Sequence, residues 1–382
     1  MKVLLFGGTG QTGPLVLQGL LDRGAEVTIF HSGQHEPPLP PVEHIHGDAH
    51  FADPIRNALG SRTFDVVIAM YGRTKVIAKE MVGRTERFIS VSGTQYYYAS
   101  PLDPAWGAFG VVTANEESPF SSDIDIDKLG VRVRETEQAI MAHHFAGHFE
   151  VTIMRYPSVY GPNAILPSDW SFVRRLLDKR PYLLLPDGGL MLRTRVYRDN
   201  AAHALLLAFD KPEAASGQIY NVSDEPPEVS LGQRIMRMAK TIGHDCEFVD
   251  VPAWLGERLY GKKVGFHHIL ETAKIRKELG YRDVVPLVDA IDVTTAWWLA
   301  NRPEPGGEVE RKLGDRFDYA AEDEIIRLLH DVGRRIDALP LQPAQTAHPF
   351  RHPRSEGEAW SEGTARGLLN YRSVYPIPLW SP

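Results

Sequence analysis

Three glycines near the N-terminus have a spacing that could bind a phosphate. They follow the pattern G-x-x-G-x-x-G, at Gly7, Gly10 and Gly13. A tight strand-to-helix turn needs a residue that tolerates positive φ, and a pyrophosphate approaching the backbone needs a residue without Cβ. An apolar run at 3–6 precedes the turn and a helical pattern at 15–21 follows it, which makes the motif specific. We therefore expect a dinucleotide to be bound by Gly7, Thr9, Gly10, Gln11, Thr12 and Gly13.

The next apolar run, at 27–30, ends in residues that bear on the choice of dinucleotide. An acidic residue there bonds the ribose 2′-OH of NAD, whereas basic or hydroxyl groups accept the 2′-phosphate of NADP. This chain has His31 and Ser32, with neither an acid nor an arginine. NADP is therefore slightly favoured over NAD, with His31 and Ser32 as predicted ligands. The alternative is that both are ordinary loop residues.

Strands alternate with helical patterns through the first half of the chain. A short strand is expected at 42–48 and a helix at 54–59, and the apolar run at 64–71 is typical of a buried parallel strand. We predict an α/β fold, a Rossmann-type doubly wound parallel sheet with a smaller C-terminal substrate subdomain and a C-terminal extension. We expect the Rossmann core at 1–165, with 193–225 returning to it. The substrate subdomain is expected at 166–192 and 226–339, and the C-terminal extension at 340–382.

Four segments together resemble the extended branch of the short-chain dehydrogenase/reductase superfamily, which includes nucleotide-sugar epimerases and dehydratases. They are the turn GGTGQTG at 7–13, Gly47-Asp48, FISVSGTQYY at 88–97, and RYPSVYGP at 155–162. The resemblance implies that Asp48 touches the adenine and that the 155–162 turn lies beside the nicotinamide. The further cofactor contacts that it implies are Tyr71, Gly72, Tyr156, Pro157, Ser158 and Val159.

The proton-transfer helix departs from the family pattern. Members carry Y-x-x-x-K on this helix, because a Tyr and a Lys four residues apart share one face. No such pair occurs between Ser92 and Arg155. The helix expected at 127–144 places Leu129 where the Tyr belongs and Val133 where the Lys belongs.

Ser92 matches the catalytic serine of the family, and its alternative role is a buried residue at a strand end. Tyr96 and Lys128 are the predicted substitutes for the missing pair. Arg132 and Arg134 could hold an anionic substrate. For each substitute, the structural alternative is a core aromatic or a solvated helix charge.

Beyond 165 the chain offers further candidates. Arg193 and Arg195 alternate along a predicted strand and could clamp an anion, or could belong to a charged edge strand. The helix expected at 167–180 has Arg175 on its outward face, and 187–189 indicates a hairpin or a turn. Asp199 is a candidate N-cap for a helix at 201–209. The apolar residues of 340–382 favour a tail that wraps over a surface.

Composition restricts the partners. The net charge of −7 argues against nucleic acid. A single cysteine, Cys246, and scattered histidines predict no metal site. No apolar run approaches the ~20 residues of a membrane span, so we expect a cytoplasmic protein. The resemblance also implies a homodimer.

The prediction is an NAD(P)-dependent oxidoreductase, epimerase or dehydratase with a non-standard acid/base, acting on a small and anionic substrate. A non-catalytic NADP-binding sensor is the alternative. An RNA-binding protein is a third reading, which the net charge disfavours.

Overall fold

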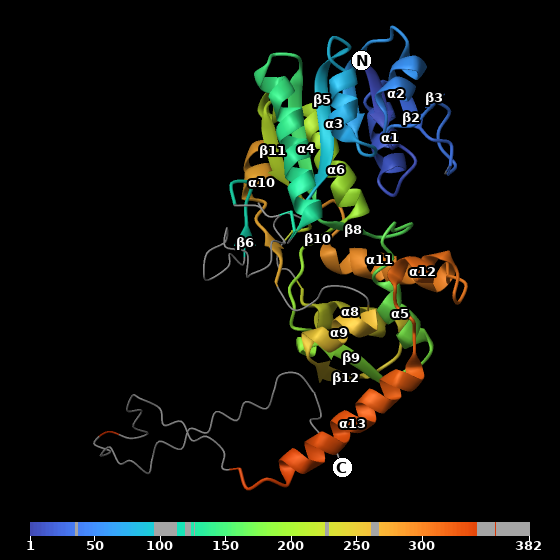
Figure 1. The fold of residues 1–382 in the computed structure, drawn as a ribbon, viewed down its shortest axis with the longest axis vertical. Helices are drawn as coiled ribbons and strands as arrows, with labels where there is room; N and C mark the ends of the chain where they lie inside the picture. The colour runs from blue at the N-terminus through green and yellow to red at the C-terminus, as the bar shows by residue number, and fades with distance from the viewer. Residues whose placement is uncertain are drawn as a thin grey trace.

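The computed structural model describes residues 1–34, 37–94, 113–118, 124–125, 127–225, 229–260, 267–341 and 356. A seven-stranded parallel sheet has the order β11-β7-β5-β4-β1-β2-β3 (Figure 1). Its strands are β1 Lys2–Phe6, β2 Glu26–His31, β3 Glu43–His46, β4 Phe64–Ala69, β5 Thr85–Gly93, β7 Glu150–Tyr156 and β11 Gln218–Asn221. The strand order changes direction between β1 and β4, which confirms the predicted doubly wound fold.

Both faces of the sheet are covered by helices, as the continuous apolar runs predict. Val3 and Leu5 pack on one face with α1 (Gly13–Asp22) and α6 (Arg198–Asp210). Leu4 and Phe6 belong to the core on the opposite face. The helices on that face are α2 (Ala52–Leu59), α3 (Thr74–Glu80) and α4 (Lys128–Phe145). The carboxyl ends of the strands are therefore left free to carry a site.

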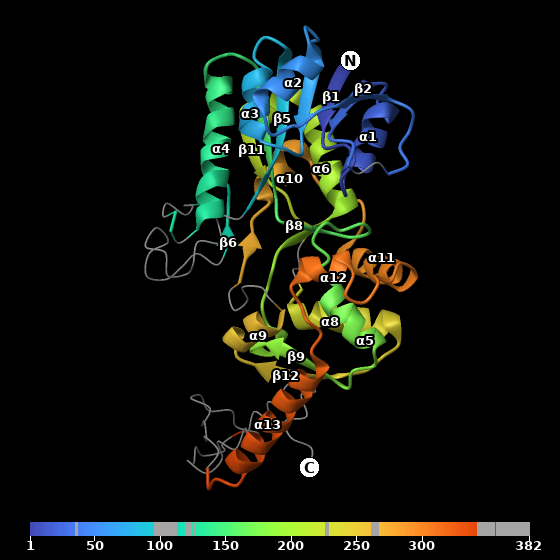
Figure 2. The same ribbon diagram turned by 45° about the vertical axis from the view of Figure 1, so that its right-hand side comes forward.

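The C-terminal elements lie beyond the carboxyl edge of the sheet, at the bottom of Figure 1 and Figure 2. They are α5 Trp170–Leu177, β9 Tyr182–Pro186, a 3₁₀ turn Asp187–Gly189, α8 Leu231–Ile242, β12 Glu247–Val251, α9 Ala253–Tyr260, α11 Leu287–Ala300, α12 Glu308–Leu313 and α13 Tyr319–Asp337. Strands β9 and β12 form a parallel pair. The assignment of this region to a substrate subdomain stays a prediction.

Short elements connect the two regions. Strand β8 (Ser158–Tyr160) pairs with β10 (Arg195–Tyr197), and β6 (Thr113–Ala114) pairs with β13 (Ile269–Leu270). Two short helices, α7 (Pro212–Ala215) and α10 (Ala273–Leu279), flank β11. Every helix of the described residues is too short or too polar to span a bilayer.

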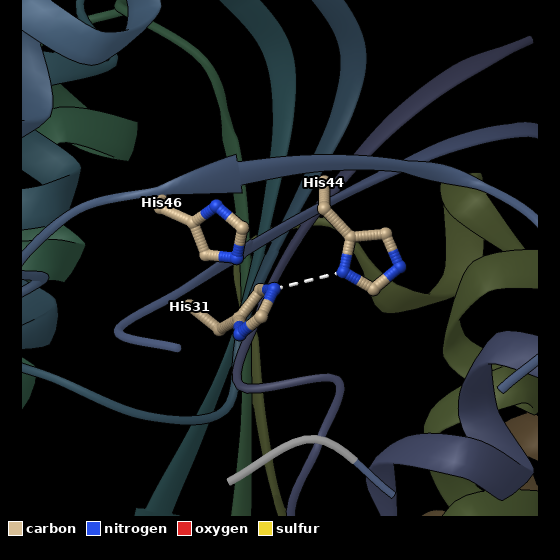
Figure 3. Close-up of side chains that lie close together, drawn as sticks. All are labelled: His31, His44 and His46. Atoms are coloured by element: carbon tan, nitrogen blue, oxygen red, sulfur yellow. Dashed lines mark hydrogen bonds between the residues drawn. The ribbon is translucent and has the colours of Figure 1, made fainter. Parts of the chain in front are cut away.

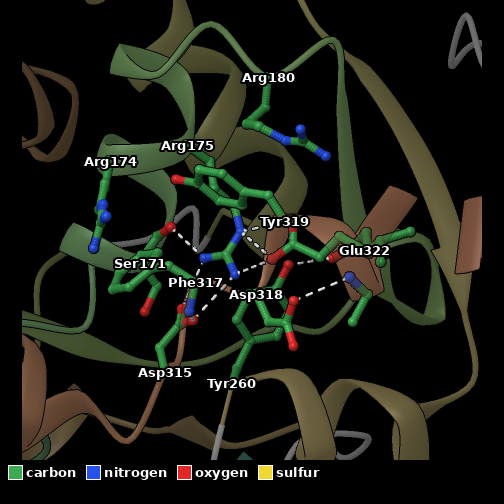
Figure 4. Close-up of polar contacts among 12 residues, drawn as sticks. Ser171, Arg174, Arg175, Arg180, Tyr260, Asp315, Phe317, Asp318, Tyr319 and Glu322 are labelled. Carbon is green, nitrogen blue, oxygen red and sulfur yellow. Dashed lines mark hydrogen bonds and ion pairs between the residues drawn. The ribbon is translucent and has the colours of Figure 1, made fainter. Parts of the chain in front are cut away.

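Arg175 lies in the interior, so its predicted outward position on α5 is wrong. Its guanidinium donates to Asp315 at 2.7 and 3.1 Å, to Glu322 of α13, and to the carbonyl of Ser171 at 2.7 Å (Figure 4). The side chain is only 1% exposed. Helical periodicity places a residue on a face, but it does not reveal that Asp315, 140 residues later, and Glu322 of α13, 147 residues later, will meet that residue.

Two smaller expectations are also corrected. Asp199 lies in the first turn of α6, and Tyr197 is the N-cap. Residues 187–189 form a turn but no hairpin, because β9 pairs with β12 and β10 pairs with β8. Turn residues predict a change of direction, whereas strand pairing depends on distant segments.

Candidate active site

The glycine turn between β1 and α1 has the backbone that its spacing predicts. Gly7 has φ +89°, and a Cβ on it would lie 2.6 Å from the Cβ of Tyr71. A Cβ on Gly13 would lie 2.3 Å from the carbonyl of Gly8. At Gly10, an added Cβ would meet only the Gly7 oxygen, at 3.7 Å, among the described residues. Packing therefore requires Gly7 and Gly13, whereas Gly10 leaves an open backbone surface of the kind that a pyrophosphate needs.

The N-terminus of α1 is suited to an anion. Thr12 at the N-cap makes no side-chain capping bond, and the first turn holds no acidic residue. The amide nitrogen of the Gln11 side chain is buried and has no hydrogen-bond partner among the described residues. A buried donor without a hydrogen-bond partner costs about 1–3 kcal/mol of stability, and a bound acceptor would remove that cost. These groups fit the phosphates of a dinucleotide.

Predicted ligands His31 and Ser32 differ in their accessibility. Ser32 is exposed at the end of β2. The His31 ring is buried; its Nδ1 accepts from the Gly33 N–H at 3.2 Å, and its Nε2 lies 2.8 Å from Nδ1 of His44. Protein atoms therefore already engage both nitrogens of His31. The role of either residue toward a 2′-phosphate stays a prediction.

Asp48 follows β3 and lies close to the end of β4. Its carboxylate accepts from the backbone N–H of His50 at 2.9 Å and from the His50 ring at 2.7 Å, and these bonds lower the pKa of Asp48. The His50 ring meets Tyr71 edge to face, with centroids 5.3 Å apart. A Cβ on Gly72 would lie 2.7 Å from Ala49. The structure thus brings the predicted adenine contact next to Tyr71 and Gly72.

A cavity of about 700 Å³ opens at the carboxyl ends of β4 and β5. Its wall contains Ser92, the predicted catalytic residue, together with Tyr71 and Gly72, which are predicted to contact the cofactor. Helix α4 closes the opposite side. The lining residues are Met70, Tyr71, Gly72, Arg73, Thr74, Lys75, Val76, Val91, Ser92, Gly93, Leu129, Arg132, Val133, Glu135 and Thr136.

A buried ion pair fixes the register of α4 against the sheet. Arg155 of β7 donates to Glu137 at 2.8 Å, and both side chains are buried. Residues four apart share a helix face, so Val133 and Leu129 follow Glu137 along one face toward the cavity. Both line the cavity wall, as the sequence register predicted. The positions opposite Ser92 that this register assigns to Tyr and Lys are therefore apolar.

The residues proposed to substitute for the Tyr and Lys lie in different places. Lys128 is exposed at the first turn of α4 and is not part of the cavity wall. Tyr96 lies outside the described residues. Arg132 lines the cavity, whereas Arg134 does not. Sequence reasoning missed Arg73 and Lys75, whose positions just after the β4 strand were the only available signal.

The 155–162 turn is built mainly for packing. The Tyr156 hydroxyl donates to the carbonyl of Ala201 at 2.6 Å, and burial raises its pKa. Pro157 is buried, while Ser158 and Val159 are partly exposed. None of these four belongs to the cavity wall. Their assignment to the cofactor stays a prediction.

In the proposed arginine clamp, Arg195 is already paired with a carboxylate. The side chain of Arg195 is 9% exposed and donates to Asp169 at 2.6 Å, with its guanidinium 4.7 Å from the ring of Tyr160. Arg193 pairs through its backbone with His268. With Asp169 already opposite Arg195, the two arginines do not act as a matched pair toward an anion.

Comparisons with known proteins agree with this architecture. Residues 121–223 match the sequence model of the NAD dependent epimerase/dehydratase family. The chain is 30% identical over 171 residues to protein YbjS of Escherichia coli, covering 38% of this chain and 49% of that protein. It is 28% identical over 183 residues to the UDP-D-apiose/UDP-D-xylose synthase of rice, covering 42% and 45%. The matched region thus spans about half the length of these relatives.

Solved structures share the fold over a longer stretch. A UDP-glucose 4-epimerase from Thermotoga maritima, determined with UDP-glucose, superimposes with a TM-score of 0.64 at 18% identity. The match covers 79% of this chain and 100% of that one. At this identity the likeness concerns the fold.

Proposed function

We propose that the chain belongs to the extended short-chain dehydrogenase/reductase superfamily and is an NAD(P)-dependent epimerase, dehydratase or oxidoreductase with a non-standard acid/base. Its proposed substrate is a small anionic molecule, with sugar nucleotides as the first class to test. NADP is slightly favoured over NAD, and the exposed Ser32 is the stronger candidate for its 2′-phosphate.

One observation carries the proposal: a single cavity joins Ser92 to the residues beside the glycine turn. The dinucleotide, when bound, would supply a hydride acceptor or donor. Ser92 would donate a hydrogen bond to the substrate oxygen at which charge develops, a role that commonly contributes several kcal/mol of transition-state stabilisation.

The charged groups of the cavity wall would orient an anionic substrate. Arg73, Lys75 and Arg132 supply positive charge, and Glu135 is the acidic residue of the wall. Two of these cations precede or begin α3, and the third faces them from α4. Charges on both walls can orient a phosphate or carboxylate.

Proton transfer must then use a group other than an α4 tyrosine. Tyr96, which follows Ser92 by four residues, remains the proposed acid/base. Lys128 is the weaker candidate because it stands outside the wall. This proposal differs from the ordinary family plan in placing the proton donor after β5 rather than on α4.

Activity assays test the proposal. Untagged protein would be incubated with NAD⁺ or NADP⁺ and a panel of UDP- and dTDP-sugars, and products followed by NMR. We expect turnover that falls about 10²-fold in Ser92→Ala. Ser90→Ala is the matched control, because it changes the same strand two residues earlier, outside the cavity wall. Failure to bind either dinucleotide would overturn the proposal.

A non-catalytic dinucleotide-binding sensor is the second candidate, and Leu129 and Val133 in the cavity favour it. This reading predicts tight binding of NADP with no product from any sugar nucleotide. It would be abandoned if Ser92→Ala, but not Ser90→Ala, removed a measurable turnover.

A further inference from the structure

Three histidines that are scattered in the sequence meet on one edge of the sheet. His31 ends β2, and His44 and His46 belong to the edge strand β3 (Figure 3). The parallel register pairs His31 with His46 and Ile29 with His44. Because alternate strand residues share a face, all three side chains project from the same face of the sheet.

The imidazoles converge rather than stack. One ring nitrogen of each histidine lies within 4.8 Å of one nitrogen of each of the other two. The ring of His31 meets those of His44 and His46 edge to face, at interplanar angles of 77° and 64°. The nitrogen edges therefore point toward a shared region, as Figure 3 shows.

We propose that His31, His44 and His46 bind a divalent transition-metal ion, with Zn²⁺ as the representative ion. Three imidazoles are a recurrent ligand set for zinc, and they leave a fourth position for water or another ligand. Imidazole selects zinc, copper or nickel over the hard ions magnesium and calcium.

Movements of the rings would convert the three histidines into a metal site. Nε2 of His31 and Nδ1 of His44 are 2.8 Å apart, joined through one proton. Two nitrogens at about 2.0–2.1 Å from a tetrahedral ion are separated by roughly 3.3 Å, so the rings of His31 and His44 must part by about half an ångström. Any other pair of nitrogens farther apart than this, within the 4.8 Å that encloses all three, must approach. The proton of His31 then moves to Nδ1, and the Gly33 N–H that bonds this atom must turn away. Gly33 is exposed, with an exposed residue on either side, which allows that turn.

The metal would join the edge strand β3 to β2. Edge strands have few partners, and an ion bound only by the folded arrangement stabilises it by mass action. The site involves none of the cavity residues, but His31 adjoins Ser32, the proposed 2′-phosphate ligand, so the variants at His44 and His46 test the metal separately from the cofactor.

Metal titration of untagged protein tests this proposal. Zn²⁺ is added in calorimetry to the full chain, with Mg²⁺ as the hard-ion comparison. We expect one Zn²⁺ per chain, binding at least about tenfold weaker in both His44→Ala and His46→Ala. His143→Ala is the matched control, since His143 and His148 form another close pair, 3.0 Å apart.

Thermal unfolding gives the second readout. Zn²⁺ should raise the Tm of the wild type and of His143→Ala, but not of His44→Ala. His44 is partly exposed and His46 is exposed, so the variants should fold. Absence of Zn²⁺ binding by the wild type, or equal weakening by His143→Ala, would overturn the proposal.

Discussion

At the scale of single residues, the decisive positions are Leu129 and Val133. They line the wall of the cavity that contains Ser92, and they share one face of α4 with Glu137. An apolar pair cannot exchange a proton, so any chemistry in this cavity depends on another group. That these two residues stand at the family's Tyr and Lys positions stays a prediction, which the position of both in the cavity wall supports.

Restoring the pair would show whether proton transfer limits the reaction. In the Tyr96→Phe variant, which lacks the proposed acid/base, adding Leu129→Tyr and Val133→Lys should raise the rate of product formation by about 10²–10⁴-fold, as a positioned acid/base contributes. The measurement is turnover of the best sugar nucleotide at saturating cofactor. Leu129→Phe with Val133→Met is the control of similar size. A gain equal to that of the control, or none, would contradict this account.

At the scale of elements, the sheet and its covering helices follow from apolar runs and periodicity. Strands β1 and β4 are apolar apart from Lys2 and Asp65, and the sequence alone predicted them. The register of α4 was also predictable, because Glu137 and Arg155 could be recognised separately before the structure joined them. Their mutual contact was not predictable from either local sequence.

The Arg155–Glu137 pair should be required for docking of α4. Glu137→Ala leaves the Arg155 guanidinium buried without this carboxylate, which costs about 3–5 kcal/mol in the free energy of unfolding. Urea denaturation measures this loss. Glu324→Ala breaks an exposed pair with Arg327 and should change the midpoint little. Equal effects of the two variants would refute the structural role.

At the scale of the whole molecule, contacts between segments that are distant in the sequence create features that local sequence patterns do not predict. The histidine trio depends on the register of β2 and β3, and the buried Arg175 depends on α13. The cavity depends on α3 facing α4 across the ends of two strands. Each arises from packing over long sequence separations, whereas local patterns report only the face or the turn.

The anchoring of α13 can be tested through Arg175. Arg175→Met leaves the carboxylates of Asp315 and Glu322 buried without their cation, so we expect about 3–5 kcal/mol lower stability. Limited proteolysis should then cut within α13. Arg180→Met is the control, because its partner Asp323 on the same helix is mostly exposed. Resistance to proteolysis equal to that of the wild type would contradict this anchoring role.

The central claim is that the glycine turn holds a dinucleotide, and Gly10 tests it most directly. A Cβ at Gly10 meets no described atom closer than 3.7 Å, so the fold should accept Gly10→Val. The same side chain would occupy the surface that the pyrophosphate needs. Titration of NADPH fluorescence should show binding to the wild type and at least about a 100-fold weaker Kd for Gly10→Val, with an unchanged Tm in the absence of cofactor. Equal binding by a folded Gly10→Val, or no binding by the wild type, would contradict the account.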